Sequence, residues 1–247
     1  RALSKGELLL HYQPQVDAVT MQLIGAEALI RWQHPEWGMV SPGRFIPIAE
    51  NSGQILEIGD WVLRTALRQI ADWRATGITV VPVAVNLSAL QFRQTSLCDT
   101  VSQALRDFDV PPQLLELELT ERIAMEDSSF TLDQISKLHA MGITLSIDDF
   151  GTGYSSLSYL RRYQIDKLKI DQSFVQDLDR ETDSGTIVRA IINMAHGMGF
   201  KTIAEGVETQ AQLDYLRQHG CDEIQGYFFS RPIPAADFER LLLPAGA

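Results

Sequence analysis

Six short apolar segments of this 247-residue chain each close on an acidic, amide or lysine residue. These residues are Asn86, Glu118, Asp148, Lys169, Glu205 and Gln225. With Glu27, which lies in an earlier segment, they offer four carboxylates and a lysine beside amides. Magnesium and manganese select carboxylate, carbonyl and water oxygens, whereas a zinc site usually contains His or Cys, which this set lacks. The set predicts a magnesium or manganese site with a cationic stabiliser.

The segments that carry these residues alternate with helical patterns. Apolar or alternating runs predict strands at residues 8–13, 23–32, 80–86, 114–119, 143–148, 165–170, 201–205 and 223–227. Three- and four-residue spacing of apolar side chains predicts helices at residues 55–74, 97–108, 130–140, 185–197 and 209–219. Strands joined mostly by helices predict an α/β fold, a TIM (β/α)8 barrel. The connection over residues 16–22 is too short for a helix, so we expect a modified barrel whose first strand is antiparallel to the others.

Side-chain alternation places charged groups together on one face of several predicted strands. Glu27, Leu29 and Arg31 share a face of the second strand, and the strands around Glu118 and Lys169 show the same separation. In a barrel the apolar faces lie under the helices, so the polar faces point inward, where an ionised group stays charged only when it is paired or bound to metal. One such residue alone is more often an exposed strand end. Several at the carboxyl ends of barrel strands indicate a catalytic site.

The composition limits the partners and the cellular compartment. The net charge of -11 repels polyanions and argues against a DNA or RNA polymer as the partner, although bound cations could reverse the local potential for a small anion. Cys98 and Cys221 lack metal-type spacing and suit a reducing cytosol. No run of apolar residues is long enough to cross a bilayer. We expect one cytoplasmic domain over residues 1–247, excised from a longer chain because it opens with Arg1. A membrane anchor in the full-length protein is compatible with this expectation.

An ordered set of motifs resembles the EAL domain family. The motifs are YQP (12–14), EALIRW (27–32), NLS (86–88), ELTE (118–121), DDFGTGYSSL (148–157), KID (169–171), EGVE (205–208) and QGY (225–227). They span nearly the whole chain in order, which is far more specific than a lone EAL tripeptide. The family's fold, a TIM-like barrel with one antiparallel strand, agrees with the fold predicted above.

The resemblance implies a metal-binding and a catalytic role for most of the polar residues. The ligands of a first metal match Glu27, Asn86, Glu118 and Asp148, and those of a second match Asp148 and Asp149. Glu205 matches a position assigned as metal ligand or general base. Lys169 matches the lysine that holds the attacking water or the developing charge. The implied catalytic residues are Glu205, Lys169 and Glu27.

The resemblance also implies substrate contacts and a loop anchor. Arg31 would contact a phosphate oxygen, and the further candidates for substrate contact are Gln13, Leu29, Asp171 and Gln225. Glu121 matches the glutamate that anchors the loop after the fifth strand. That loop, residues 149–156, couples metal binding to dimerisation in the family.

The implied activity is that of a phosphodiesterase that opens the bacterial second messenger cyclic di-GMP to linear pGpG. Two magnesium or manganese ions would neutralise phosphate charge, lower the pKa of a bridging water and hold the attacking and leaving oxygens in line. Calcium is expected to inhibit, because its larger radius and looser coordination spoil that geometry. The implied partners are cyclic di-GMP, a second copy of the chain in a homodimer, and an upstream sensor or GGDEF domain.

Two alternatives stay open on the sequence. The first is a catalytically silent receptor that binds cyclic di-GMP, which usually lacks several of the acidic positions that this chain has. The second is another barrel enzyme, because a fold alone does not determine chemistry. A Schiff-base aldolase could use Lys169, but it has no need for so many converging carboxylates.

Overall fold

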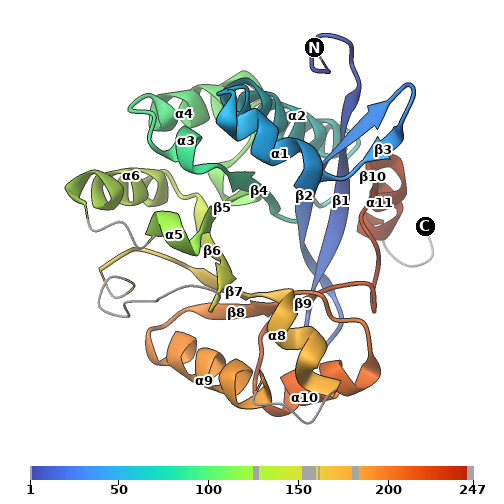
Figure 1. Cartoon of the computed structure of the whole chain (residues 1–247), viewed down its shortest axis with the longest axis vertical. Helices are drawn as coiled ribbons and strands as arrows, with labels where there is room; N and C mark the ends of the chain where they lie inside the picture. Colours follow the sequence, from blue (N-terminus) through green and yellow to red (C-terminus); the bar gives the residue numbers. More distant parts are fainter. Residues whose placement is uncertain (1, 125–127, 152–159, 161, 180–183, 244–247) are drawn as a thin grey trace.

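The computed structural model describes residues 2–124, 128–151, 160, 162–179 and 184–243. Within these residues the chain forms a ten-stranded sheet, of which eight strands close into a barrel (Figure 1). The barrel strands are β1 Leu8–Asp17, β2 Leu23–His34, β4 Val83–Leu87, β5 Leu115–Thr120, β6 Thr144–Phe150, β7 Lys167–Ile170, β8 Lys201–Ala204 and β9 Glu223–Gln225. The short strands β3 Gly38–Val40 and β10 Ile233–Pro234 pair with β2 and β1 outside the barrel.

The strand directions confirm the predicted modified TIM barrel. β1 pairs antiparallel with both of its barrel neighbours, β2 and β9, whereas the pairs from β2 through β4 to β9 are parallel. The tight turn after β1 explains the reversal: Asp17 Oδ1 accepts hydrogen bonds from the backbone N–H groups of Val19 (2.9 Å) and Thr20 (2.7 Å). An aspartate that bonds the backbone in this way favours a turn over a helix.

All eight predicted barrel strands are present, with small differences at their ends. Pro82 has no N–H to donate to a ladder, so β4 begins at Val83 rather than at residue 80. β8 ends at Ala204, which places Glu205 one residue beyond the strand. β9 ends at Gln225 instead of residue 227.

Helices cover the outside of the barrel (Figure 1). The described α-helices are α1 Pro42–Asn51, α2 Ile55–Ala75, α3 Ala89–Phe92, α4 Leu97–Asp107, α5 Glu121–Ala124, α6 Ser129–Ala140, α8 Gln172–Gln176, α9 Ser184–Gly197, α10 Gln210–Gln218 and α11 Ala235–Leu242, and 3₁₀ turns occupy Pro112–Leu114 and Asp177–Asp179. The five predicted helices correspond to α2, α4, α6, α9 and α10. The sequence pattern does not predict the other helices. In α1 the residue Pro47 interrupts the pattern, and α3, α5 and α8 are too short to show a helical period. No helix in the described ranges is both long and apolar enough to cross a bilayer.

The apolar core lies between the helices and the strands, outside the barrel. Leu115, Leu117 and Leu119 of β5 are fully buried, as are Leu67 and Ile70 of α2. Burial of one such side chain contributes about 1.5–3 kcal/mol. Because this face of each strand is used for packing, the alternate residues point into the barrel, as predicted.

The inside of the barrel is polar at its base as well as at its carboxyl end. Lys167 Nζ lies 3.0 Å from Glu116 Oε2 and 2.7 Å from Glu223 Oε2. Burial lowers the pKa of Lys167, but the two carboxylates outweigh this effect and hold its pKa above the usual value. The lysine is therefore charged, and this ion triad fills the base of the barrel.

The segment after β8 packs closely against the segment after β9. Val207 N donates to Gln225 O at 3.2 Å, and Phe228 N donates to Val207 O at 2.9 Å. A Cβ atom on Gly226 would lie 2.1 Å from Val207 O and 2.3 Å from Val207 N. Only glycine allows this close approach of the two backbones. The two hydrogen bonds made there hold the segment that carries Glu205 against the segment after β9.

We expect Gly226→Ala to destabilise the protein by about 1–3 kcal/mol, because the methyl group overlaps backbone atoms that other bonds hold in place. Urea unfolding followed by circular dichroism measures the change. The matched control is Gly197→Ala in α9, where nothing lies within 4 Å of the added Cβ atom. That variant should be unchanged or more stable by up to about 1 kcal/mol. Equal unfolding midpoints for the two variants would show that the close approach is unimportant.

Candidate metal centre

One buried lysine joins the residues at the carboxyl end of the barrel. Lys169, on β7, is fully buried, and its Nζ atom lies 2.7 Å from Glu118 Oε2 on β5 and 2.7 Å from Glu205 Oε1. Asp148 Oδ1, on β6, lies 3.1 Å away, and Glu27 Oε2, on β2, 3.5 Å away. Four carboxylates from four places in the barrel therefore surround one ammonium group.

Amide side chains orient the carboxylate of Glu27. Asn86 Nδ2, from β4, donates to Glu27 Oε1 at 2.7 Å, and Gln225 Nε2, from β9, donates to Glu27 Oε2 at 2.6 Å. Gln225 also donates to Gln13 Oε1 on β1 at 3.1 Å, and its own Oε1 accepts from Gln15 Nε2 at 3.0 Å. The amides thus hold Glu27 in one orientation without adding charge.

A bulge brings a further carboxylate to the same side of β6. Consecutive residues of a regular strand point to opposite faces. The register with β7 shifts between Ile147 and Phe150, and Asp149 has a φ of 55°. Bulges of this kind redirect side chains, and aspartate tolerates the left-handed conformation better than most residues. As a result, single oxygens of Asp148, Asp149 and Glu205 lie within 4.8 Å of one another.

Burial raises the pKa of three of these carboxyl groups, and neighbouring carboxylates raise it further. Burial, followed by the charges of Asp148 and Asp171, raises the pKa of Asp149 to about 6. Burial raises the pKa of Glu205 to about 8, although Lys169 acts in the opposite direction. The pKa of Glu118 is also well above its usual value, because of burial and then the charge of Glu27.

For Glu27 and Lys169, neighbouring charges and hydrogen bonds outweigh the effect of burial on the pKa. Burial raises the pKa of Glu27, but Lys169 and the amide donors Gln225 and Asn86 outweigh it, so the pKa is below its usual value. Burial lowers the pKa of Lys169, and the surrounding carboxylates raise it well above the usual value. Glu27 and Lys169 are therefore an ionised pair at the centre of the cluster.

The donor set fits divalent cations of the magnesium type. Five carboxyl groups share one ammonium group, and among the described residues Glu118 Oε1 is buried without a hydrogen-bond partner. Within the same part of the chain Asp148 Oδ1 also lacks a hydrogen bond of good geometry, although Lys169 Nζ lies 3.1 Å away. Hard divalent cations take carboxylate and carbonyl oxygens as ligands. Cations at this cluster would give these oxygens a partner.

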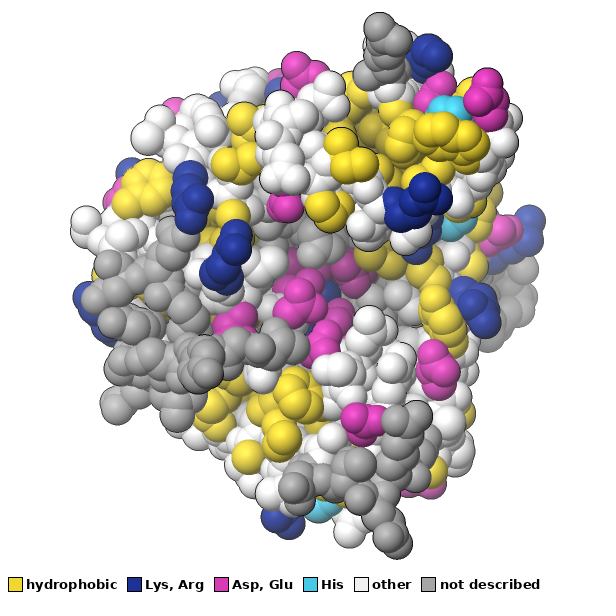
Figure 2. Space-filling model, viewed as in Figure 1, with side chains coloured by type: hydrophobic (Ala, Val, Ile, Leu, Met, Phe, Trp, Pro, Cys, Tyr) yellow, Lys and Arg dark blue, Asp and Glu magenta, His cyan; other side chains and the backbone are white. Residues whose placement is uncertain are grey.

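The cluster opens into a hollow on the surface of the protein. Figure 2 shows acidic side chains gathered in the hollow at the centre of the face. This pocket has a volume of about 390 Å³ and is lined by Gln13, Glu27, Leu29, Asn86, Asp148, Gln172, Gln176, Glu205, Gly206, Glu208, Gln225, Gly226 and Tyr227. A small anionic substrate can therefore reach the carboxylates from solvent.

The remaining predicted residues lie around the cluster. Arg31 lies on β2 beyond Leu29, and its Nη1 donates to Ile30 O at 2.9 Å. Asp171 is the N-cap residue of α8, and its Oδ1 accepts from Ser173 N at 3.0 Å. Glu121 Oε2 accepts from Gly151 N at 3.0 Å, which ties the start of the loop after β6 to α5. Residues 152–156 of the predicted loop lie outside the described residues.

The sequence interpretation missed several residues of the pocket. Gln172 and Gln176 come from the short helix α8, and Glu208 closes the EGVE motif but has no predicted role. Tyr227 also lines the pocket; it is 49% exposed, and Arg231 Cζ lies 4.2 Å from its ring centroid. Its position directly after Gln225 and Gly226 was the signal that could have found it.

Fold and cluster together define a modified barrel with an acidic cluster, suited to divalent cations, at its carboxyl end. The EAL domain family matches residues 1–232, so the chain belongs to that family. It is 47% identical over 235 residues to the bifunctional diguanylate cyclase/cyclic di-GMP phosphodiesterase MucR of Pseudomonas aeruginosa, covering 95% of this chain and 34% of MucR. It is 44% identical over 242 residues to the cyclic di-GMP phosphodiesterase NbdA of the same species, covering 98% of this chain and 31% of NbdA.

A solved structure shows the same fold. The PaMucR phosphodiesterase in complex with c-di-GMP has a TM-score of 0.93 and 46% sequence identity, with 96% of each chain covered. The chain spans about a third of the length of the curated relatives MucR and NbdA.

The central lysine should be essential for folding when no cation is present. Lys169→Met leaves buried carboxylates uncompensated, and we expect a loss of about 3–5 kcal/mol in unfolding free energy in EDTA. Urea unfolding at pH 7 measures this. Lys201→Met is the matched control, because Lys201 is 67% exposed and lies 3.5 Å from Glu223 Oε1. That variant should lose less than about 1 kcal/mol. Equal losses would mean that Lys169 does not hold the cluster together.

Proposed function

We propose that this chain is a phosphodiesterase that hydrolyses cyclic di-GMP to linear pGpG with two divalent cations, Mg²⁺ or Mn²⁺. The observation that carries the proposal is the ring of carboxylates around Lys169 at the open end of the barrel. Membership of the EAL family supports the choice of substrate. So do the names of MucR and NbdA and the c-di-GMP complex of PaMucR.

The residues divide into two cation sites. The first consists of Glu27, Asn86, Glu118 and Asp148, and the second of Asp148 and Asp149, with Glu205 as a further ligand or as the general base. When bound, the cations neutralise phosphate charge, acidify a water and align the attacking and leaving oxygens. Asn86 uses its Nδ2 group to donate to Glu27, so its carbonyl oxygen is the atom left for the cation.

The protein side chains supply charge and position. Lys169 is a compact ammonium held by four carboxylates, and it stabilises negative charge that develops on the phosphate oxygens. Glu205, at the wall of the pocket, accepts the proton of the attacking water in the general-base role. Arg31 binds a phosphate oxygen, and Gln13, Leu29, Asp171 and Gln225 contact the remainder of the substrate.

We extend the proposal to the full-length protein. Because the chain spans about a third of its curated relatives, we propose an upstream sensor or GGDEF domain that regulates this one. The domain acts as a homodimer in the cytoplasm, where a soluble second messenger is accessible. Glu121, through its bond to Gly151 N, connects the cation site to the loop that follows β6.

The direct test is incubation of the purified domain with cyclic di-GMP and Mg²⁺ or Mn²⁺, with pGpG followed by chromatography. We expect metal-dependent pGpG formation that EDTA abolishes. Glu27→Ala should lower the rate at least about 100-fold, because it removes a cation ligand. Glu36→Ala, at an exposed position outside the pocket, is the matched control and should leave the rate unchanged.

Other outcomes of this assay separate the alternatives. Binding of cyclic di-GMP without turnover under both metals would overturn the catalytic claim and make the domain a receptor. Turnover that persists in EDTA would contradict a metal-dependent mechanism. Borohydride trapping of a substrate on Lys169 would favour a Schiff-base enzyme instead.

Calcium should bind without supporting turnover. It takes oxygen ligands at about 2.3–2.6 Å in flexible geometry, whereas magnesium requires about 2.0–2.1 Å in octahedral geometry. We expect added Ca²⁺ to inhibit the Mg²⁺-dependent rate, with relief by excess Mg²⁺. Titration of Ca²⁺ against two fixed Mg²⁺ concentrations measures this competition. A rate in Ca²⁺ alone equal to that in Mg²⁺ would contradict the proposed geometry.

A further inference from the structure

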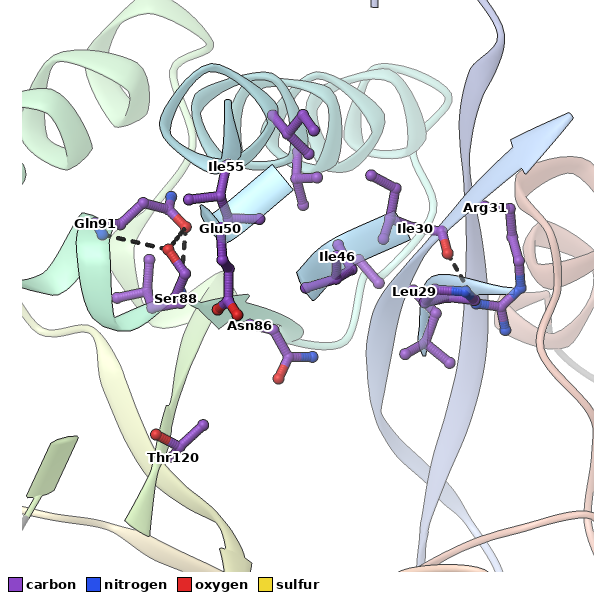
Figure 3. A pocket seen from close by; sticks show the side chains of 16 residues that line it. Leu29, Ile30, Arg31, Ile46, Glu50, Ile55, Asn86, Ser88, Gln91 and Thr120 are labelled. Atoms are coloured by element: carbon purple, nitrogen blue, oxygen red, sulfur yellow. Dashed lines mark hydrogen bonds between the residues drawn. The ribbon is translucent and has the colours of Figure 1, made fainter. Parts of the chain in front are cut away.

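Pockets lie at both ends of the barrel. Figure 3 shows an apolar pocket of about 270 Å³ at the carboxyl end. Glu50 lines it, together with Leu29 and Asn86, which also line the acidic pocket. A larger pocket of about 700 Å³ lies at the amino end and has no lining residue in common with the other two. This base pocket is large enough for a small organic molecule.

Acidic groups dominate the lining of the base pocket. Seven barrel strands contribute to it, and Pro82, directly before β4, completes the ring. Its apolar surface includes Val19, Ile24 and Ile165. The acidic lining residues are Asp17, Glu116, Asp166, Asp222 and Glu223, and the basic ones are Lys167, Lys201 and Arg217. A pocket in which acidic groups outnumber basic ones attracts cations.

Two helices also end at the base pocket. Gly199 and Gly220, which line it, each follow the last residue of a helix, α9 or α10, by two positions. The carboxyl end of a helix carries a partial negative charge, which favours a nearby cation. The helix ends and the acidic side chains therefore act in the same direction.

Two of the basic side chains in the base pocket already have partners. Lys167 Nζ lies 3.0 Å from Glu116 Oε2 and 2.7 Å from Glu223 Oε2. Arg217 Nε donates to Ala18 O in the turn after β1. An anion in the base pocket would have to compete with these partners.

Glu116 has an oxygen that lacks a partner. The residue is 2% exposed and lines the base pocket, and its Oε1 atom has no hydrogen-bond partner within the described part of the chain. Glu223 Oε1 lies 3.5 Å from Nζ of Lys201, whose side chain is 67% exposed. A buried carboxylate oxygen without a donor is unfavourable. A ligand that brings N–H groups into the base pocket would supply the missing donor.

We propose that the base pocket binds a linear aliphatic polyamine. Each ammonium group of such a molecule has several N–H donors for carboxylate and backbone oxygens. Its methylene segments pack against apolar surface such as that of Ile24 and Ile165. A metal ion fits less well, because in the described ranges the acidic side chains that meet the spacing of a metal site are Asp148, Asp149 and Glu205, at the other end of the barrel. This site does not depend on the proposed phosphodiesterase activity.

The first test measures spermidine binding to the purified domain by isothermal titration calorimetry. Saturating Mg²⁺ is present to occupy the acidic cluster at the carboxyl end, because spermidine also has affinity for carboxylates there. The proteins are the wild type, Glu116→Gln at the base and Asp149→Asn in the acidic cluster, and each variant removes one carboxylate. We expect one spermidine per wild-type chain, about 10- to 100-fold weaker binding to Glu116→Gln, and unchanged binding to Asp149→Asn.

The second test uses two exposed lysines. Lys201→Met removes a positive charge at the base pocket, so spermidine should bind about 2- to 5-fold more tightly. Lys137→Met is the matched control, because it removes the same charge from α6, where the side chain is 57% exposed and does not line the base pocket. That variant should leave the affinity for spermidine unchanged.

The absence of spermidine binding to the wild type would overturn the proposal. Equal weakening by Asp149→Asn would place the amine at the other end of the barrel, and equal tightening by Lys137→Met would reduce the effect to net charge; both results refute the base site. The thermal midpoint of each unliganded variant verifies that it is folded. If Glu116→Gln is unfolded, the pair Lys201→Met and Lys137→Met decides, because both lysines are exposed.

Discussion

The arrangement of the barrel depends on one buried positive charge. Lys169 is fully buried and has four carboxylates within 3.5 Å, so neither the lysine nor the acids would be tolerated there alone. The apolar faces of the strands must then pack outward under the helices, because the inner face is occupied by ions. The same rule holds at the base of the barrel, where Lys167 pairs with Glu116 and Glu223. The interior of this barrel is therefore polar because of its two ion clusters, whereas branched apolar residues usually fill the inside of a TIM barrel.

The antiparallel strand β1 adds a second kind of support. β1 runs in the opposite direction to the parallel strands, and its Gln13 lies opposite Glu27 of β2 in the register. Gln13 and Gln15 bond to Gln225, which itself bonds to Glu27. These amides orient the carboxylate of Glu27 without adding negative charge to the cluster. An acidic side chain in their place would add negative charge.

Much of the fold and of the cation cluster could be predicted from the sequence, because both follow from short-range patterns. Alternation along each strand decides which residues point inward, and a parallel barrel brings the carboxyl ends of its strands together. That was sufficient to place Glu118 and Lys169 side by side. The predicted assignment of each residue to a catalytic role came from the resemblance and stays a prediction.

The remaining features depend on contacts that no local pattern reveals. The bulge at Asp149 turns its side chain toward Asp148, whereas strict alternation would separate the two. Pro47 interrupts the helical pattern of α1, and α8 has only 5 residues, so the pocket residues Glu50 and Gln172 could not be assigned to a surface. Tyr227 lies next to a strand, where an aromatic residue is more often part of the core, so its 49% exposure could not be predicted from the sequence.

The bond between Gln225 and Glu27 joins residues 198 positions apart in the chain. Because synthesis proceeds from the amino terminus, nearly all of the barrel leaves the ribosome before β9 can close it. Until then Glu27 lacks one of its two amide donors, and the gap between β1 and β8 is open to water. A chain broken off before residue 223 would carry most of the acidic residues and still have no closed centre to hold them.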